Sequence, residues 1–370
     1  MDAHVLTGKY QGSRTWLEGV LSELPNVDRV NRYILYSEDP AATRRLCEAP
    51  NICHHRIPAT GPAARLLLFW PQARRRDGFD VLLTQYIAPP LLAGPQVVVV
   101  HDLLFESHPR FFPLSVRLRN RALVRLSTQR ARRVLAVSEY TRSELVRRYG
   151  MPKERILLAP NAVSTPPQPA QPLTITGTFV LFVGRIEPRK NLSLLLDALD
   201  RLDRPGLRLV VVGKADFGAH ATLTRLRGRK DVVHLEDVDA GNLSALYHNA
   251  AMLVFPSEGE GFGIPVLEAL ACGAAVVCSN VTALPEVAGQ FARFFDPHAQ
   301  DAPVALAEAI ASVLDHPPRH EASALAAHLS RFTWRRAAEA TVEAVTGASL
   351  LADGSSPRRD TAARIDSQRR

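Results

Sequence analysis

Short apolar runs, rich in β-branched residues, alternate along this chain with longer stretches of helical periodicity. Each run is bounded by glycine, proline or polar residues, which is typical of strands that are buried on both faces. This alternation favours an α/β fold in which helices cover both sides of parallel sheets. The expected strands are Tyr33–Tyr36, Ile52–Ile57, Val81–Leu83, Val97–Val100, Val134–Val137 and Ile156–Leu158 in the first half, and Phe179–Val183, Leu207–Val212, Val232–Leu235, Met252–Phe255 and Ala275–Cys278 in the second.

A chain of 370 residues is too long for one ordinary hydrophobic core, so we expect two domains. The proline-dense segment PNAVSTPPQPAQPLTITG divides the two sets of strands and predicts an extended linker over 164–176. We therefore expect two doubly wound, Rossmann-like domains, 1–163 and 177–331, facing a central cleft. Ligands bind such sheets at the carboxyl ends of the strands. The polar tail 351–370 has the composition of a disordered segment.

The most informative stretch is FPSEGEGFGIPVLEALACG, in which Glu260 and Glu268 stand eight residues apart. A buried strand, a glycine loop and a helix start follow one another here, with Pro265 suited to the first turn and Gly273 to the helix end. The free N–H groups of a helix start favour an anion, and carboxylates accept hydrogen bonds from hydroxyls. The arrangement fits a ligand with a central diphosphate and a hydroxylated ring at each end, which describes a nucleotide sugar.

The alternative is that both glutamates are ordinary surface residues, one solvated in a loop and the other paired on a helix. Glu268 lies within the apolar stretch IPVLEALACGAAVV, however, where a carboxylate needs a partner. We therefore expect this carboxylate to be paired or bound to a ligand.

A second group of polar residues opens the second half, in FVLFVGRIEPRKNLSLLLDAL. The strand ends at Gly184, the cations Arg185 and Lys190 follow, and Asn191 is suited to cap the next helix. Two cations at the carboxyl end of a strand, beside a helix N-terminus, would clamp a diphosphate. The alternative is two solvated cations on a surface turn.

Composition excludes several classes of protein. No run approaches the roughly 20 apolar residues of a membrane span, and the start MDAHVLTGKYQGS has no apolar signal core, so a cytoplasmic location is expected. The four cysteines lack metal or redox spacing, which favours reduced thiols, and we see no compelling metal cluster.

The net charge of +8 is unevenly distributed, because no acidic residue stands between Glu106 and Glu139 while eight arginines do. Much of this segment, from Pro113 to Val134, has the pattern of one helix. A solvated face is one interpretation of the Arg-rich segment 110–133, and contact with an anionic membrane surface or a polyprenyl phosphate is the other main one. Nucleic-acid binding is the least favoured, and we expect no nucleic-acid partner.

Several motifs together resemble the retaining glycosyltransferases of family 4, which have the GT-B fold. These motifs are HDLLFESHPRFF, SEYTRSELVRRYG with ILLAPNAV, GRIEPRKN, PSEGEGFGIPVLEALACGAAVV and FTWRRAAEATVEAV. The resemblance extends from Asp2 to Val345. It also implies a terminal helix, 332–350, which we expect to pack back on the first domain.

The resemblance implies a role for each matching residue. Arg185 and Lys190 would hold the donor diphosphate and stabilise the leaving nucleoside diphosphate, while Glu268 would bind the ribose and Glu260 the donor hexose. His101 would face the reaction centre from the first domain. The other residues expected at the donor site or cleft are Gly12, Asn161, Gly184, Gly261, Phe262 and Gly263.

The implied reaction retains the anomeric configuration, with a front-face attack as the usual proposal. Arg and Lys replace the metal ion of other transferases, so no cofactor is expected. The implied donor is GDP-mannose or another nucleotide hexose, and the acceptor a glycan or a polyprenyl-diphosphate-linked chain in cell-surface polysaccharide synthesis, reached peripherally at the inner face of the plasma membrane. The alternatives are a soluble-acceptor enzyme of the sucrose- or trehalose-synthase type and a non-catalytic nucleotide-sugar binding protein.

Three segments depart from the family pattern. The chain starts at MDAHVLTGKYQGS, where a full first strand usually precedes the aspartate, so a late start or a trimmed strand is expected. The glycine loop KYQGSRTW lacks the more usual double glycine. Glu236 stands where many members have a glycine, near the place of the nucleotide base.

Overall fold

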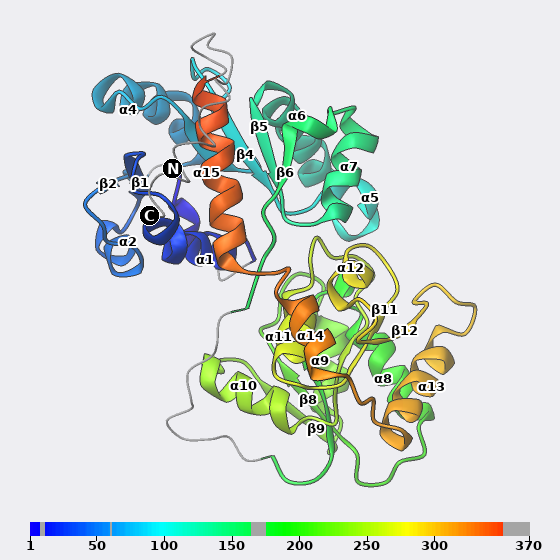
Figure 1. Cartoon of the computed structure of the whole chain (residues 1–370). Coiled ribbons are helices and arrows are strands. Elements are labelled where there is room, and N and C mark those ends of the chain that lie inside the picture. Colours follow the sequence, from blue (N-terminus) through cyan, green and yellow to red (C-terminus); the bar gives the residue numbers. More distant parts are fainter. Residues whose placement is uncertain (8–11, 60, 164–174, 351–370) are drawn as a thin grey trace.

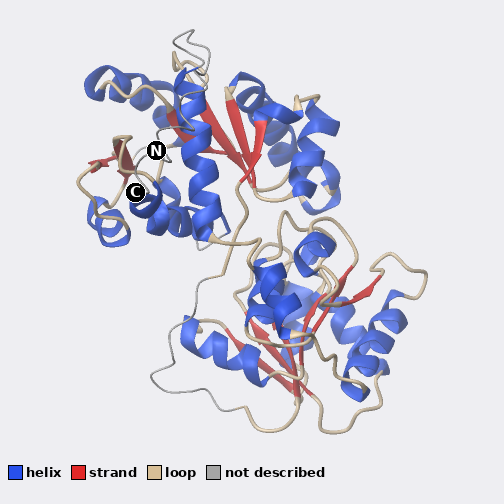
Figure 2. Cartoon of the chain, in the orientation of Figure 1, coloured by secondary structure: helices blue, strands red, loops and turns tan. Residues whose placement is uncertain are grey.

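The computed structural model describes residues 1–7, 12–59, 61–163 and 175–350. The expected tail at 351–370, and all of the expected linker except residues 175 and 176, lie outside this range. Figure 1 shows two lobes, which we call the N-terminal lobe (1–163) and the C-terminal lobe (175–331). Strands form the centre of each lobe and helices cover them, as Figure 2 shows by colour. The α/β prediction is confirmed.

The N-terminal lobe contains two parallel sheets, one with the order β1-β2 and the other with the order β3-β4-β5-β6. Its elements are η1 (His4–Thr7), α1 (Gly12–Val27), β1 (Tyr33–Ser37), α2 (Pro40–Leu46), β2 (Ile52–Arg56), α3 (Pro62–Ala64), η2 (Arg65–Phe69), α4 (Trp70–Asp77), β3 (Leu82–Gln85), β4 (Gln96–Val100), α5 (Leu104–Ser107), η3 (Pro109–Phe111), α6 (Leu114–Arg130), β5 (Arg133–Ala136), α7 (Glu139–Tyr149), η4 (Lys153–Arg155) and β6 (Ile156–Leu158).

The first three residues lie between these two sheets. The backbone N–H of Asp2 donates to the Leu83 carbonyl of β3 at 2.9 Å, and that of Ala3 donates to the Tyr36 carbonyl of β1 at 2.8 Å. Met1–Ala3 therefore occupies a short part of the position between β1 and β3, where the family pattern predicts a first strand.

The C-terminal lobe is a doubly wound sheet of parallel strands with the order β12-β11-β10-β7-β8-β9. This order reverses between β7 and β10, as in a dinucleotide-binding fold. The elements of this lobe and of the chain beyond it are β7 (Phe179–Val183), η5 (Pro188–Lys190), α8 (Leu192–Arg201), β8 (Arg208–Val212), α9 (His220–Arg227), β9 (Val232–Leu235), α10 (Ala240–Asn249), β10 (Met252–Phe255), α11 (Ile264–Ala271), β11 (Val276–Ser279), α12 (Leu284–Ala288), β12 (Arg293–Phe295), α13 (Ala302–Asp315), α14 (Ala322–Leu329) and α15 (Trp334–Leu350).

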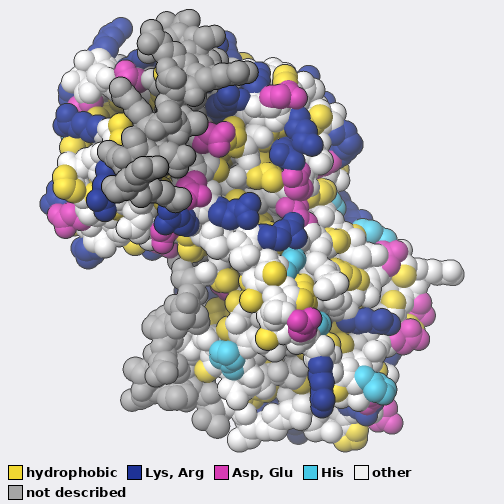
Figure 3. Space-filling view, viewed as in Figure 1, with side chains coloured by type: hydrophobic (Ala, Val, Ile, Leu, Met, Phe, Trp, Pro, Cys, Tyr) yellow, Lys and Arg dark blue, Asp and Glu magenta, His cyan; other side chains and the backbone are white. Residues whose placement is uncertain are grey.

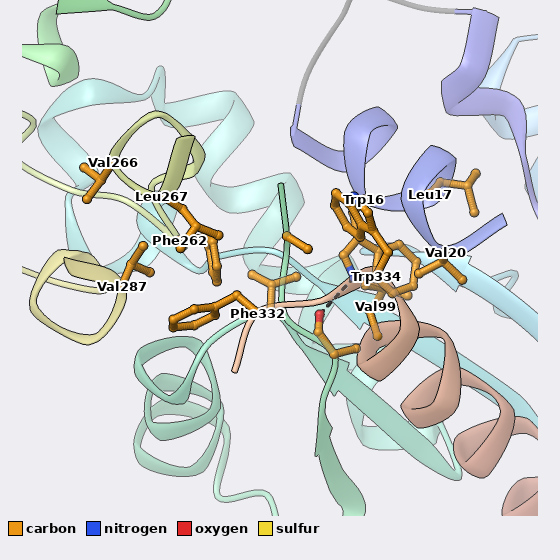
Figure 4. Close-up of a cluster of buried hydrophobic side chains, with 14 of the residues drawn as sticks. Trp16, Leu17, Val20, Val99, Phe262, Val266, Leu267, Val287, Phe332 and Trp334 are labelled. Carbon is orange, nitrogen blue, oxygen red and sulfur yellow. Dashed lines mark hydrogen bonds between the residues drawn. The ribbon is translucent and has the colours of Figure 1, made fainter. Parts of the chain in front are cut away.

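One apolar cluster connects the lobes. Helix α15, red-orange in Figure 1, leaves the C-terminal lobe and runs along the N-terminal lobe beside α1. In Figure 4, Phe332 lies near Phe262 of the C-terminal lobe, and Trp334 lies near Trp16 of α1. The Phe262 and Phe332 ring centroids are 5.6 Å apart. All four side chains are buried, so the halves share a continuous core.

Three local expectations were wrong. The helix expected from Pro113 to Val134 ends at Arg130, because β5 begins at Arg133. Asn191 stands at the start of α8 in a left-handed conformation (φ 54°) and its side chain makes no capping bond, because the preceding turn η5 sets its backbone. Strand β12, three residues long, was not predicted, and the terminal helix begins at Trp334 rather than at 332.

Candidate active site

The site forms where the order of the C-terminal sheet reverses, because the loops after β7 and β10 meet there. A backbone hydrogen bond joins them, from the N–H of Glu258 to the carbonyl of Arg189 at 2.9 Å. The charged side chains of both loops form one cluster. Lys190 Nζ lies 2.7 Å from Glu260 Oε1, Arg189 lies 3.1 Å from the same oxygen, and Arg189 also pairs with Glu187 at 2.5 Å.

Glu260 is buried, with 7% of its surface exposed, so its charge depends on these partners. Burial alone would raise the pKa of this carboxyl, but the charges of Lys190 and Arg189 outweigh it and lower the pKa to about 2. The interpretation of Glu260 as a solvated loop residue is therefore wrong. In the ligand-free protein its charge is balanced by cations that an incoming phosphate would also attract.

The loop that carries Glu260 is fixed at both ends. The N–H of Glu260 donates to Thr282 Oγ1 at 2.9 Å. Gly263 caps α11 with a φ of 108°, a conformation that favours glycine. The first N–H groups of α11 therefore open next to the loop, which is the geometry of an anion site.

Arg185 lies outside the cluster around Glu260. It follows Gly184 at the end of β7, and its guanidinium pairs with Asp216 at 2.5 Å. The two cations of the expected diphosphate clamp thus have different carboxylate partners, Glu260 for Lys190 and Asp216 for Arg185. A bound diphosphate would have to exchange with one or both of these pairs.

Glu268 lies on α11, half-buried, and accepts a hydrogen bond from the Tyr247 hydroxyl of α10 at 2.8 Å. The expectation that this carboxylate is paired is confirmed. Burial raises its pKa to about 7, although the Tyr247 hydroxyl acts in the opposite direction. No contact among the described residues joins Glu268 to Glu260, so a ligand that used both would span the length between them.

The N-terminal lobe presents His101 to the same loop. A Cβ atom on Gly261 would come 2.0 Å from the carbonyl oxygen of His101, so only glycine permits this approach of the lobes. The His101 side chain is buried, and its Nε2 lies 2.7 Å from Gln85 Oε1. Burial lowers the pKa of the imidazole to about 3, so the ring is neutral. The rings of Trp16 and Tyr86 enclose it.

Two further sequence-predicted residues, Gly12 and Asn161, belong to the N-terminal lobe. Gly12, the first residue of α1, faces α11 across the lobes, since a Cβ there would lie 3.9 Å from Ile264 Cδ1. Asn161 is buried after β6, and its Oδ1 has no hydrogen-bond partner. Buried polar atoms are usually satisfied, so this oxygen is a candidate acceptor for a ligand or a water molecule.

A pocket of about 590 Å³ opens between the lobes beside the cations. The N-terminal lobe supplies an apolar wall that includes Ile87, Phe111 and Phe112, and the C-terminal lobe supplies the Arg185–Asp216 pair. The pocket therefore has one mostly apolar side, to which Asp102 adds a carboxylate, and one charged side.

Sequence reasoning missed several members of this site. Arg189 directly precedes Lys190 and was overlooked because Lys190 matches the motif better. Asp216 lies four residues beyond the end of β8, which was predicted, and Gln85 ends β3 beside His101. Asp216 and Gln85 could have been predicted from their positions, because both lie at or just beyond the ends of strands next to a recognised loop.

Among the described residues, no group of three or more His, Cys, Asp or Glu gathers as a metal site. Over the same ranges, no helix is long and apolar enough to cross a bilayer. The four cysteines are free.

Comparison with known proteins gives two matching family models. The model described as Glycosyl transferases group 1 matches residues 169–328, and that described as Glycosyltransferase Family 4 matches 29–166. The O-antigen chain mannosyltransferase B of Escherichia coli is 33% identical over 266 residues, which is 67% of this chain and 69% of the relative.

Two other similarities differ in their coverage. The serotype-specific mannosyltransferase WbdA of Escherichia coli is 30% identical over 239 residues, 59% of this chain but only 29% of that protein. The solved structure of the lipopolysaccharide outer core galactosyltransferase WaaB, in its apo form, superposes with a TM-score of 0.66 at 14% identity, over 94% of this chain and 98% of the other. That likeness concerns the fold, and the N- and C-terminal lobes have the GT-B arrangement.

Proposed function

The chain belongs to glycosyltransferase family 4, and from that premise we propose that it is a retaining hexosyltransferase that uses a nucleotide sugar, with GDP-mannose as the first candidate donor. The observation that carries this proposal is the buried cluster of Arg189, Lys190 and Glu260 beside the N-terminus of α11. Cations and free N–H groups at one point fit a diphosphate, and a carboxylate between them fits sugar hydroxyls.

The donor would lie along the C-terminal lobe. Lys190 and Arg185 would take the diphosphate, with the N–H groups of Phe262 and Gly263 beside it. Glu260 would accept hydrogen bonds from the hexose. Glu268, held by Tyr247, would accept them from the ribose. Gly184 and Gly261 would let the backbone come close to the ligand.

The chemistry follows from charge. Cleavage of the bond between sugar and phosphate leaves negative charge on the diphosphate and positive character on the sugar ring. Fixed cations stabilise the first as it develops. His101, neutral and enclosed, would contact the sugar from the N-terminal lobe without adding a positive charge beside it. In a front-face reaction the acceptor hydroxyl attacks from the side on which the diphosphate leaves, so no covalent enzyme intermediate and no metal cofactor is required.

The acceptor would enter the pocket between the lobes. Its wall of Phe111, Phe112 and Ile87 offers aromatic and apolar faces, on which the C–H faces of sugar rings and prenyl carbons can pack. A glycan, or a glycan on polyprenyl diphosphate, has both kinds of surface. We therefore infer that the acceptor is an unfinished cell-surface polysaccharide.

The Arg-rich segment 110–133 would bring this pocket to an anionic membrane surface. Helix α6 exposes Leu114 (62%) and Leu118 (58%) among its arginines. On the face drawn in Figure 3, Lys and Arg side chains gather mainly over the N-terminal lobe. Arginines beside exposed leucines fit the headgroup region of a bilayer.

One experiment separates the open alternatives. Purified protein is incubated with UDP-, GDP-, ADP- and dTDP-hexoses, with and without a polyprenyl-diphosphate-linked mannosyl acceptor in anionic vesicles, and nucleoside diphosphate release is followed. We expect release from GDP-mannose that depends on the lipid-linked acceptor, and an α-linked product by NMR. Release with soluble glucose or fructose phosphate instead would indicate a sucrose- or trehalose-type enzyme. Binding of a donor without release under any condition would indicate a non-catalytic binder.

A further inference from the structure

The two lobes contact each other at the N-terminus of α7, in addition to the apolar core and the ion pair of Arg110 with Glu258. Helix α7 belongs to the N-terminal lobe, and its first N–H groups need acceptors. Ser138 supplies one, because its Oγ accepts from the N–H of Thr141 at 3.0 Å. The N–H groups of the two residues before Thr141, Glu139 and Tyr140, are satisfied from the other lobe.

Glu286, on α12 of the C-terminal lobe, supplies those acceptors. Its Oε1 accepts from the N–H of Glu139 at 2.9 Å and its Oε2 from the N–H of Tyr140 at 3.2 Å. A carboxylate at a helix N-terminus combines hydrogen bonds with a favourable interaction with the helix dipole. This helix cap comes from a different lobe, so it exists only while the lobes are together.

The same helix start also reaches the loop that carries Glu260. Ser138 Oγ donates to the carbonyl of Gly261 at 2.7 Å, and Thr141 Oγ1 donates to the carbonyl of His101 at 3.1 Å. The hydroxyls of Ser138 and Thr141 thus hold the backbones of Gly261 and His101. In the proposed donor complex, Glu260, the neighbour of Gly261, and the ring of His101 would flank the donor sugar. The absence of a side chain on Gly261 permits this contact.

We propose that Glu286 and Ser138 are positioning residues that couple closure of the lobes to assembly of the donor site. With the lobes closed, Glu286 caps α7 while Ser138 fixes the Gly261 carbonyl, and the Glu260 loop is brought onto His101. With the lobes apart, α7 loses two acceptors and the loop loses its contact with the N-terminal lobe. Neither residue touches the reacting atoms.

The role of the Glu260 loop in donor binding rests on the proposed function, whereas the contact of Glu286 with α7 does not. The test therefore has two independent readouts. Small-angle scattering of the ligand-free protein measures how far the lobes separate. Steady-state kinetics with the donor measure how closure affects binding. The variants are Glu286→Ala, which removes the cap, Glu286→Gln, which keeps the shape and an acceptor but removes the charge, and Glu308→Gln as a control, because Glu308 is exposed on α13 of the same lobe.

We expect Glu286→Ala to increase the radius of gyration of the free protein. Its KM for the donor should rise about tenfold, as is common on loss of hydrogen bonds to a charged group, while kcat changes less than about threefold because bound donor restores closure. Glu286→Gln should show a smaller change of the same kind, and Glu308→Gln none. Melting curves by circular dichroism show whether Glu286→Ala folds. If it does not, the comparison of Glu286→Gln with the wild type tests the proposal.

An unchanged radius of gyration together with an unchanged donor KM in Glu286→Ala would overturn the proposal. So would a fall in kcat at constant KM, since that points to a chemical role. If the wild-type protein releases no nucleotide from any donor, the proposed function fails, whereas the scattering comparison still decides whether Glu286 holds the lobes together.

Discussion

The two walls of the cleft differ in the charge of the side chains that line them. The C-terminal wall holds paired charges, Glu260 with Lys190 and Arg189 in a largely buried cluster, and Arg185 with Asp216 in a partly exposed pair. The N-terminal wall is mostly apolar, with His101 uncharged and a surface that includes Phe111, and Asp102 is the carboxylate that it adds to the pocket. The difference is consistent with the proposed division of roles, in which one lobe binds the charged part of the donor and the other positions the sugar and the acceptor.

The net charge of the two halves of the chain has the opposite distribution, because the N-terminal half is the basic one. Residues 1–163 contain 24 Lys and Arg against 14 Asp and Glu, whereas the rest of the chain has 21 against 23. The positive charge of the N-terminal lobe is concentrated in the Arg-rich segment 110–133, where six of the eight arginines are exposed. The basic character of this protein therefore does not mark its anion site, which is locally balanced by carboxylates.

The largest effect is expected at Lys190 on the charged wall. Lys190→Ala removes a cation from the diphosphate and leaves Glu260 with Arg189 as its remaining cation, so kcat/KM should fall about a hundred- to a thousandfold. Nucleotide release measures this change. Lys230→Ala, on the exposed surface of the same lobe, serves as the control and should stay within about twofold. A loss below about threefold in Lys190→Ala would contradict the assignment.

The next effect distinguishes the N-terminal wall from the charged C-terminal wall. His101→Ala should lower kcat about a hundredfold, because a side chain in contact with the reacting sugar is lost, while the donor dissociation constant changes little. Rapid kinetics and calorimetric titration of the nucleotide separate the two quantities. His316→Ala, exposed in the other lobe, is the control. Loss of donor binding without loss of kcat would place His101 in the donor site instead.

A pH effect sharpens the role of Glu268. Its pKa is raised to about 7, so the carboxyl is protonated below that pH and loses part of its capacity to accept ribose hydroxyls. Donor affinity should therefore increase by up to about tenfold between pH 6 and pH 8 as the group ionises. Glu268→Gln should bind donor weakly and with little pH dependence. A Glu268→Gln variant that keeps the wild-type pH profile would assign the titration to another group.

The smallest effect is expected on the acceptor side. Phe111→Ala removes part of the apolar wall and should raise the KM for the acceptor about three- to tenfold, with donor affinity unchanged. Leu118→Ala, exposed on α6, is the matched control for kinetics with a soluble acceptor analogue. A change in donor affinity instead of acceptor KM would assign Phe111 to the donor side.

The C-terminal lobe could be predicted further than the N-terminal lobe. All its strands except β12 were expected, because buried parallel strands are apolar runs, and β12 has only three residues, one of them Arg293. Glu260 and Lys190 stand in motifs at strand ends, where the sheet brings them together without further information. In the N-terminal lobe the strands were predicted equally well, but their division into two sheets was not. Met1–Ala3 bonds to both β1 and β3 over too few residues to form a strand that would join the two sheets.

The unpredicted site residues share a physical reason. Glu286 acts on a helix more than 140 residues away in sequence, and Asp216 and Arg189 acquire their roles from a charge partner rather than from a local pattern. Asn191 has a residue type that favours capping, but its backbone conformation overrides the preference. Such pairings arise in the packed fold and leave no periodic signal in the sequence.

The central claim, that the charged wall binds the nucleoside diphosphate part of the donor, is tested most directly by calorimetric titration of nucleoside diphosphate into the wild-type protein and two variants. The account predicts that the wild type and His101→Ala bind with similar affinity, and that Lys190→Ala binds at least about a hundredfold more weakly. Retained binding in Lys190→Ala together with lost binding in His101→Ala would contradict it.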